Sequence, residues 1–398
     1  MSIRRSAALA VAVTLLASAC HGNDTRSQTK PTSAKTPVTT GGGGVSTTTT
    51  TAPISPAIVL SAQASRLDAY ATTRPLVTQT VVPSPAADRN GVDVSGQICF
   101  DPTTPNRFVA VDRTAAADGQ VGWGVFELSG RAIGKLSAKE VARLVPTFQP
   151  SPDGATPFGC SFLADGRLLT TDLGNQRAGS PNGQLIEWFP PFEADSVASC
   201  KVAVALAAPE GVLVDTDRVL VAESRGASVG SFLVSALPTS SGATGGCTLH
   251  DATGAALAGG VVHTPWLQAP AAQVLSSPAA LAVAPNGDFF VSNPTTGVIA
   301  EVTPDGRFVR RVLAPPSGEV LGHRPFSTGT PVGLAVDPSG TLYYADPGLI
   351  VHNATTVAGL RTGTVRRITF VQGVPRPPEV IDTGLQAPYG IGIWLPGA

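Results

Sequence analysis

Residues 277–313 read SPAALAVAPNGDFFVSNPTTGVIAEVTPDGRFVRRVL, and this stretch decides the fold. Four runs, 280–284, 288–292, 297–303 and 307–313, have the length and the Val, Ile, Leu and Phe content of β-strands. Asn286-Gly287 and Asp305-Gly306 lie between strands of this set, and such dipeptides are strong signals of tight hairpin turns. The stretch therefore predicts a four-stranded antiparallel meander.

The same register recurs along the chain. The common form is Pro-x-Gly, which is Pro-Ala-Ala in the copy at Pro278, then an apolar strand, a turn and a second apolar strand that ends in Asp, Glu or Asn. Full copies begin at Pro157, Pro209, Pro278 and Pro331, and their second strands end at Asp172, Glu223, Asn293 and Asp346. A degenerate first copy runs from Gly96 to Asp112, and a last copy begins at Pro388 and runs off the C-terminus after Trp394. Six copies predict an all-β fold, a six-bladed β-propeller of four-stranded antiparallel blades.

The last copy supplies only one inner strand, so its blade needs three strands from elsewhere. Residues 57–60, 67–71 and 76–82 are extended and apolar, and they can provide those strands. We therefore expect N-terminal and C-terminal strands to pair and close the ring, which removes exposed sheet edges.

Two segments resemble a known group of propellers. GLAVDPSGTLYYAD at 333–346 and LAVAPNGDFFVSN at 281–293 resemble NHL-repeat propellers and, more broadly, the senescence-marker-protein/gluconolactonase superfamily. The resemblance implies the propeller fold over most of residues 96–394. It is strong evidence for the fold and weak evidence for an activity, because this motif describes a blade and not a site.

The N-terminus has the features of an export signal. Arg4 and Arg5 precede an apolar run, 7–19, which is shorter than the roughly 20 residues that a membrane span needs. Ala17-Ser18-Ala19 before Cys20 resembles the lipobox of bacterial lipoproteins, which implies cleavage before Cys20 and acylation of its thiol. The alternative is an ordinary signal peptide with a chance cysteine.

Residues 20–56 follow with Gly41–Gly44, a run of threonines at 47–51 and few large apolar side chains. Such a segment cannot bury enough surface to offset its ordering entropy, so we expect a disordered linker. The predicted organisation is a signal peptide at 1–19, a lipidated Cys20 with a linker to 56, and a propeller at 57–398. It places the protein in the bacterial cell envelope, outside the cytoplasm and attached to a membrane.

One segment outside the repeat predicts a helix at 136–144. Ser137 and Glu140 form a capping box, and Leu136 and Val141 have the spacing of a hydrophobic staple. We expect this helix in the connection between the first two blades.

The chain order of a blade places its long and short loops on opposite faces. The start of the first strand and the end of the second lie on one face, together with the connections between blades. The long irregular segments fall on that face, at 83–95, 147–157, 264–277, 314–331 and 347–362. We call it the long-loop face and the other the tight-turn face, and we expect a ligand- or protein-binding site on the long-loop face.

Acidic or amide side chains end the second strand of each full copy, and Asp112 ends that of the degenerate one. Converging oxygen ligands suit Ca²⁺ or Mg²⁺, but a side chain repeated at this position is also placed to accept backbone N–H groups of the next loop. We favour the structural interpretation, because these residues repeat as the blade repeats.

The residues just before each inner strand lie closest to the channel mouth. They are Gly96, Phe158, Glu210, Ala279, Val332 and Tyr389. Phe158, Glu210 and Tyr389 are candidate ligand-binding residues, and so is the loop pair His323-Arg324. The gluconolactonase resemblance implies an alternative: a divalent metal, Ca²⁺ or Zn²⁺, held by Glu210 with Asn293 and Asp346, would polarise a lactone or ester carbonyl for hydrolysis. We favour a binding module, because one carboxylate at the mouth does not make a metal site and no nucleophile motif is present.

The composition and the cysteine content limit which partners and which compartment are expected. Charged residues make up 14% of the chain and the formal net charge is −1, which gives no electrostatic support for nucleic-acid binding. Four cysteines remain after Cys20, and an exported protein permits disulfides. We expect Cys99–Cys160 and Cys200–Cys247 among the three possible pairings, and a monomer with no confidently implied cofactor.

Overall fold

The structure of the protein is a computed structural model, and it describes residues 57–396 except 64, 86, 88–90, 115–120, 146–155, 176–180, 194–196, 242–245, 251–255 and 354. The signal peptide, Cys20 and the linker expected at 20–56 lie outside the described residues. No helix among the described residues is long and apolar enough to cross a membrane.

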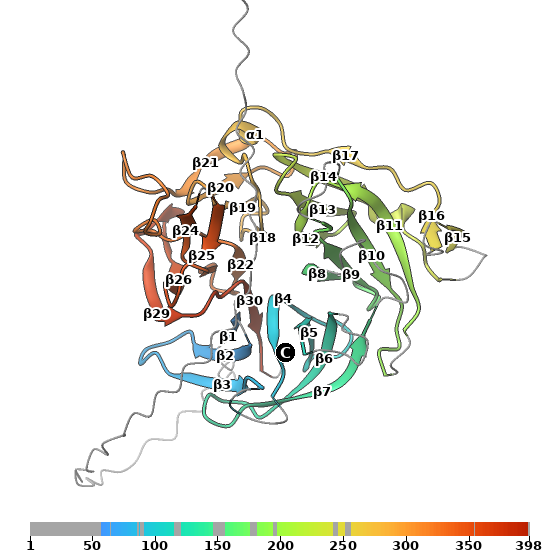
Figure 1. Ribbon diagram of the computed structural model, residues 1–398, viewed down its shortest axis with the longest axis horizontal. Coiled ribbons are helices and arrows are strands. Elements are labelled where there is room, and N and C mark those ends of the chain that lie inside the picture. Colours follow the sequence, from blue (N-terminus) through green and yellow to red (C-terminus); the bar gives the residue numbers. More distant parts are fainter. Residues whose placement is uncertain are drawn as a thin grey trace, which may run out of the picture.

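Six antiparallel sheets surround a central axis, and each is a blade (Figure 1). Blade 1 contains β4 (Val94–Phe100), β5 (Arg107–Asp112), β6 (Gly122–Ser129) and β7 (Ser137–Leu144). Blade 2 contains β8 (Pro157–Phe162), β9 (Leu168–Asp172), β10 (Gly183–Trp188) and β11 (Ser199–Leu206). Blade 3 contains β12 (Pro209–Asp215), β13 (Arg218–Glu223), β14 (Ser228–Leu233) and β17 (Thr264–Pro265).

The remaining blades follow the same plan. Blade 4 contains β18 (Leu281–Val283), β19 (Phe289–Asn293), β20 (Val298–Val302) and β21 (Phe308–Leu313). Blade 5 contains β22 (Gly333–Val336), β23 (Leu342–Asp346), β26 (Gly363–Ile368) and β29 (Glu379–Leu385). Blade 6 contains β30 (Gly390–Trp394), β1 (Ile58–Gln63), β2 (Arg66–Ala71) and β3 (Thr78–Val82). The six-bladed all-β fold predicted from the repeat is confirmed.

Short elements decorate the ring. β15 (Cys247–His250) and β16 (Ala256–Ala258) extend the sheet of blade 2, where β16 pairs with β11 in parallel. The hairpins β24 (Leu349–His352) with β25 (Thr355–Ala358) and β27 (Phe370–Val371) with β28 (Val374–Pro375) are inserted in blade 5. A 3-10 turn η1 (Val234–Ala236) and one helical turn α1 (Ala271–Val274) complete the described elements.

The ring closes between the two ends of the chain. β1 pairs antiparallel with β30, with Ile58 opposite Trp394 and Ala62 opposite Gly390. The expected pairing of N-terminal and C-terminal strands is therefore confirmed. Since β30 runs from the long-loop face to the tight-turn face, β1 begins on the tight-turn face.

The helix predicted at 136–144 is wrong, because Ser137–Leu144 forms β7, the outermost strand of blade 1. β7 pairs with β6 from Ser129 opposite Ser137 to Trp123 opposite Leu144. Without this strand, the outer edge of β6 would leave a row of backbone donors and acceptors unpaired. Strand pairing therefore overrides the local capping-box signal.

Apolar side chains fill the interfaces between neighbouring blades. Trp123 of blade 1 and Trp188 of blade 2 belong to one buried cluster, and Phe290 of blade 4 shares another with Tyr344 of blade 5. The Cys99–Cys160 disulfide joins the inner strands of blades 1 and 2, and Cys200–Cys247 joins β11 to β15. Both bonds have the pairing expected from the sequence.

The glycine of the Pro-x-Gly motif marks where inner strands of adjacent blades meet. A Cβ on Gly159, Gly211, Gly333 or Gly390 would lie 2.5 Å or less from a backbone oxygen of the next blade. These oxygens belong to Glu210, Ala279, Tyr389 and Gly96 respectively. At one of these contacts the Gly211 N–H donates to the Ala279 carbonyl across the blade junction, with a distance of 2.6 Å. Only a residue without a side chain fits at such an approach.

We expect Gly159→Ala to destabilise the protein by about 1–3 kcal/mol, because the new methyl group must push two inner strands apart. Urea unfolding measures the change. Gly259→Ala is the matched control, since a Cβ at Gly259 meets no atom within 4 Å. Equal unfolding midpoints for the two variants would contradict the close approach at Gly159.

Candidate functional site

Side chains of opposite blades meet on the axis at the long-loop face. Phe158 and Leu173 of blade 2 and Val332 of blade 5 form one buried cluster, and Tyr389 of blade 6 packs against it. The ring centroids of Phe158 and Tyr389 are 6.2 Å apart in an edge-to-face arrangement. Blades 2 and 5 face each other across the ring, so this axial cluster closes the channel at its long-loop end.

Glu210 of blade 3 lies beside the axial cluster. The residue is 7% exposed, and burial raises the pKa of its carboxyl to about 7, although a hydrogen bond from Ser224 acts in the opposite direction. Burial also raises the pKa of Tyr389 to about 12, while Arg113 lowers it and Glu210 raises it further. The hydroxyl of Tyr389 therefore lies within the electrostatic influence of one cation and one carboxyl.

The structure brings together three of the five ligand-binding candidates: Phe158, Glu210 and Tyr389. His323 and Arg324 are exposed on the loop between β21 and β22 and do not belong to the axial cluster. This loop is tied to the β24–β25 hairpin, because the Val351 N–H donates to the Gly322 carbonyl over 2.7 Å. The pair is thus part of a surface built out from blade 5.

The strand-ending acidic side chains bind loop backbone, as the structural interpretation expects. Asp172 accepts hydrogen bonds from the N–H groups of Thr156 and Gly174, each 2.8 Å long. Asp346 accepts from the N–H groups of Thr330 and Gly348, also 2.8 Å each. Each carboxylate therefore ties the connection before its blade to the loop after its strand.

Asn293 and Asp346, the expected partners of Glu210 at a metal, are engaged by groups of the neighbouring loops and strands. The amide of Asn293 donates to the Val274 carbonyl and to the Ser276 hydroxyl, each over 3.3 Å. Asp346 is occupied by its backbone donors and by the Thr364 hydroxyl at 2.7 Å. The described part of the chain contains no group of three or more His, Cys, Asp or Glu side chains that could hold a metal.

Reasoning from sequence missed Arg113, Leu173 and Ser224. Each directly follows a strand-ending acidic residue, Asp112, Asp172 or Glu223. This position faces the channel mouth in the same way as the residue before each inner strand. The repeat register therefore marks these three residues as well, because each lies one position after the acidic residue that ends its strand.

Comparisons with known proteins show the fold alone. No protein-family model matches the chain, and no curated protein matches it either. A chain from the nidogen/laminin complex aligns with 86% of this chain and 100% of its own at 14% identity and a TM-score of 0.51. A luciferin-regenerating enzyme aligns with 84% of this chain and 92% of its own at 13% identity and a TM-score of 0.50. The chain is thus similar in architecture to an interaction protein and to an enzyme.

We expect Glu210→Gln to flatten the dependence of stability on pH. Between the ordinary carboxyl pKa of 4.5 and the folded-state value of about 7, the folded protein holds a proton that the unfolded chain has released. Stability therefore falls as pH rises through this window, by an amount on the order of 3 kcal/mol for the shift in Glu210. Urea unfolding at pH 5, 6, 7 and 8 measures the slope.

Asp172 and Glu187, whose pKa values burial raises to about 6 and about 7, add similar slopes to the wild type and the variant. The difference between the two proteins therefore isolates Glu210. The exposed Glu193→Gln is the control and keeps the wild-type slope. An unchanged slope in Glu210→Gln would show that this carboxyl is solvated.

Proposed function

We propose that the protein is an extracytoplasmic binding module that engages a ligand or another protein through its long-loop face. The observation that carries this proposal is the axial cluster with Glu210 and Arg113 beside it, because residues of five blades converge there. Arg113 and Tyr389 keep part of their surface exposed, so an aromatic ring and a cation are available at the mouth. Six-bladed propellers include proteins of this kind, such as the one in the nidogen/laminin complex.

The two disulfides suggest a protein outside the cytoplasm, where such bonds persist. We propose further that cleavage before Cys20 leaves a lipid anchor on that residue. The linker then enters the propeller at Ile58, next to Trp394 on the tight-turn face. An anchor attached there tethers the ring at its tight-turn end and leaves the long-loop face free for partners.

The alternative function is a gluconolactonase-like, metal-dependent hydrolysis of a lactone or ester. Glu210 is the residue that favours it, because a carboxyl with a pKa near 7 suits acid–base chemistry. Asn293 and Asp346 do not support it, since their side chains are held by loop and strand groups. We therefore place binding ahead of hydrolysis.

Site-specific photocrosslinking in intact cells tests the binding face. A photoreactive side chain replaces Arg113 or His323 on the long-loop face, and Asn286 or Ser339 on the tight-turn face. We expect one discrete adduct from the first pair and none from the second, because only the long-loop positions lie within the proposed contact. Adducts confined to the second pair, or absent from all four, would overturn the proposal.

The anchor predicts a change in partitioning between detergent and water. Wild-type protein from its native cell should enter the detergent phase of Triton X-114, because two or more acyl chains bind lipid stably. Cys20→Ala should move it to the aqueous phase with the propeller intact, whereas Ser18→Ala is a nearby control that keeps the anchor. Aqueous wild-type protein would show an ordinary signal peptide instead.

A further inference from the structure

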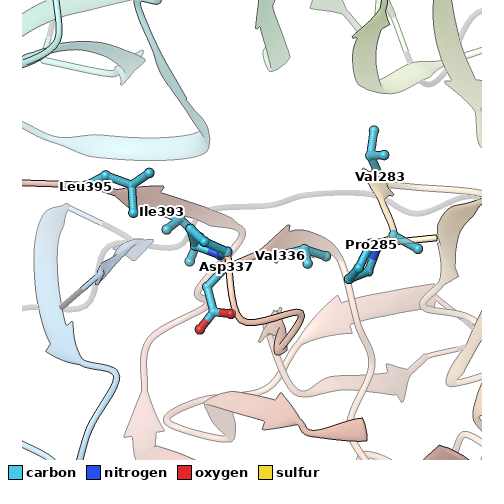
Figure 2. Close-up of a pocket in the computed structure, with 8 residues that line it drawn as sticks. Val283, Pro285, Val336, Asp337, Ile393 and Leu395 are labelled. Atoms are coloured by element: carbon cyan, nitrogen blue, oxygen red, sulfur yellow. The ribbon is translucent and has the colours of Figure 1, made fainter. Parts of the chain in front are cut away.

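Two open hollows lie on the tight-turn face, and they differ in the chemistry of the groups that line them. The larger, of about 520 Å³, lies among blades 4, 5 and 6 and includes Val283 and Pro285 (Figure 2). Its one ionisable side chain, Asp337, already accepts hydrogen bonds from the N–H groups of Ser339 and Thr341, at 2.9 and 3.0 Å. This hollow therefore offers no side chain that would react with a small molecule.

The smaller hollow, of about 240 Å³, lies among the inner strands of blades 1, 2 and 3. Cys99 and Cys160 both line it, together with Phe100, Phe162 and Leu213, and we call it the disulfide recess. The bond between the two cysteines joins β4 of blade 1 to β8 of blade 2. A small molecule that enters the recess from solvent therefore meets the disulfide itself.

The second disulfide of the protein is enclosed. Cys200 is 0% exposed and Cys247 is 5% exposed, and both pack with Phe189 in one buried cluster. Neither of them lines either hollow, whereas Cys99 is 9% exposed and faces the recess. Thiol–disulfide exchange requires a thiolate to reach a sulfur atom. One bond is thus open to exchange and the other is protected from it.

The Cys99–Cys160 bond spans a blade junction that lacks the motif glycine. The Gly96 carbonyl lies against Gly390 of blade 6, so the next residue, Gln97, holds the place of the motif glycine in blade 1. Gly96 faces the Phe158 carbonyl of blade 2 at a Cβ distance of 3.0 Å, against 2.5 Å or less at the four motif glycines. The Cys160 N–H donates to the Gln97 side-chain oxygen over 3.4 Å. The disulfide and this hydrogen bond therefore link two blades where the close glycine contact is missing.

We infer that the Cys99–Cys160 bond is a thiol–disulfide exchange site, at which a small thiol enters the disulfide recess and reduces the bond. Exchange removes the covalent link between the inner strands of blades 1 and 2. The Cys160 sulfur lies 3.6 Å from the Gln97 carbonyl oxygen, so the thiol that is released has a hydrogen-bond acceptor in place. This inference does not depend on the binding function proposed for the long-loop face.

The exchange proceeds in two displacements. The thiolate of the small molecule attacks the sulfur of Cys99, which is the more exposed of the two cysteines. A new S–S bond forms to Cys99, the old bond breaks, and its electron pair leaves on the Cys160 sulfur, which takes a proton from water. A second small thiolate attacks its own partner in the mixed disulfide and releases Cys99, which is protonated in turn. Two small thiols are thereby oxidised to one disulfide, and the protein gains two thiols.

Reduction in the folded state, followed by alkylation and peptide mass mapping, tests the inference. The full chain with Cys20→Ala retains the four disulfide-bonded cysteines alone, and it is incubated without denaturant in 2-mercaptoethanol at pH 8, where part of the reagent is thiolate. Samples are quenched with N-ethylmaleimide over time. We expect Cys99 and Cys160 to be labelled at least tenfold faster than Cys200 and Cys247, with a 2-mercaptoethanol adduct on Cys99 as the intermediate.

Pro102→Trp tests whether the reagent enters through the recess. Pro102 is exposed on the recess wall, so a bulky ring there should slow labelling of Cys99 and Cys160 at least threefold. The matched control is Pro285→Trp, because Pro285 is exposed at the corresponding turn of blade 4 and lines the other hollow. The control should react at the rate of the parent protein, and labelling of Cys200 and Cys247 should not change in either variant.

Three results would overturn the inference. The first is labelling of all four cysteines at one rate, which would show that reduction requires global unfolding. The second is faster labelling of Cys200 and Cys247, or no labelling of any cysteine in the folded protein. The third is an unchanged rate in Pro102→Trp, which would show that the recess is not the route to the bond.

Discussion

The close approach of inner strands at the motif glycines is the constraint on which the rest of the propeller depends. It occurs at four blade junctions through Gly159, Gly211, Gly333 and Gly390, and Gly96 comes nearly as close to the Phe158 carbonyl, with a Cβ position 3.0 Å away. Phe158, Glu210 and Tyr389, which each precede a motif glycine, then have little freedom, because their own carbonyls are packed against the preceding blade. Their side chains are directed to the axis. The backbone packing of the repeat therefore determines which positions face the axis. The residue type at each of these positions differs from blade to blade.

The number of hydrogen-bond donors, and not burial, separates the structural carboxyls from the one we assign to the site. Asp172 and Glu210 are both buried, and burial raises both pKa values, to about 6 and about 7. The backbone N–H groups of Thr156 and Gly174 donate hydrogen bonds to the Asp172 carboxylate and offset part of the cost of burying its charge. Asp172 therefore holds two loops together. Glu210 has the Ser224 hydroxyl and lies on the axis among Phe158, Tyr389 and Arg113. A buried carboxyl with so little compensation is typical of binding and catalytic sites.

The local sequence was sufficient to predict the strands of the blades, because the turn dipeptides and the Pro-x-Gly register lie within a few residues of the strands that they define. It predicted strands within one or two residues of β18, β19, β20 and β21, and it predicted the closure of the ring by β1 and β30. It failed at β7, where Ser137 and Glu140 signal a helix and pairing with β6 decides for a strand. It also could not reveal that Phe158 and Val332 meet across the ring or that a cavity opens beneath Val283, since both depend on how six blades are arranged around one axis.

The central claim is that side chains from separate blades form one cooperative cluster on the axis. A double-mutant cycle of Phe158→Ala and Tyr389→Ala, read by urea unfolding, measures their coupling directly. The edge-to-face contact predicts a coupling energy of about 0.5–1.5 kcal/mol, because each truncation removes the partner's ring contact. Strictly additive effects of the two substitutions would contradict the cluster and, with it, the site that we place there.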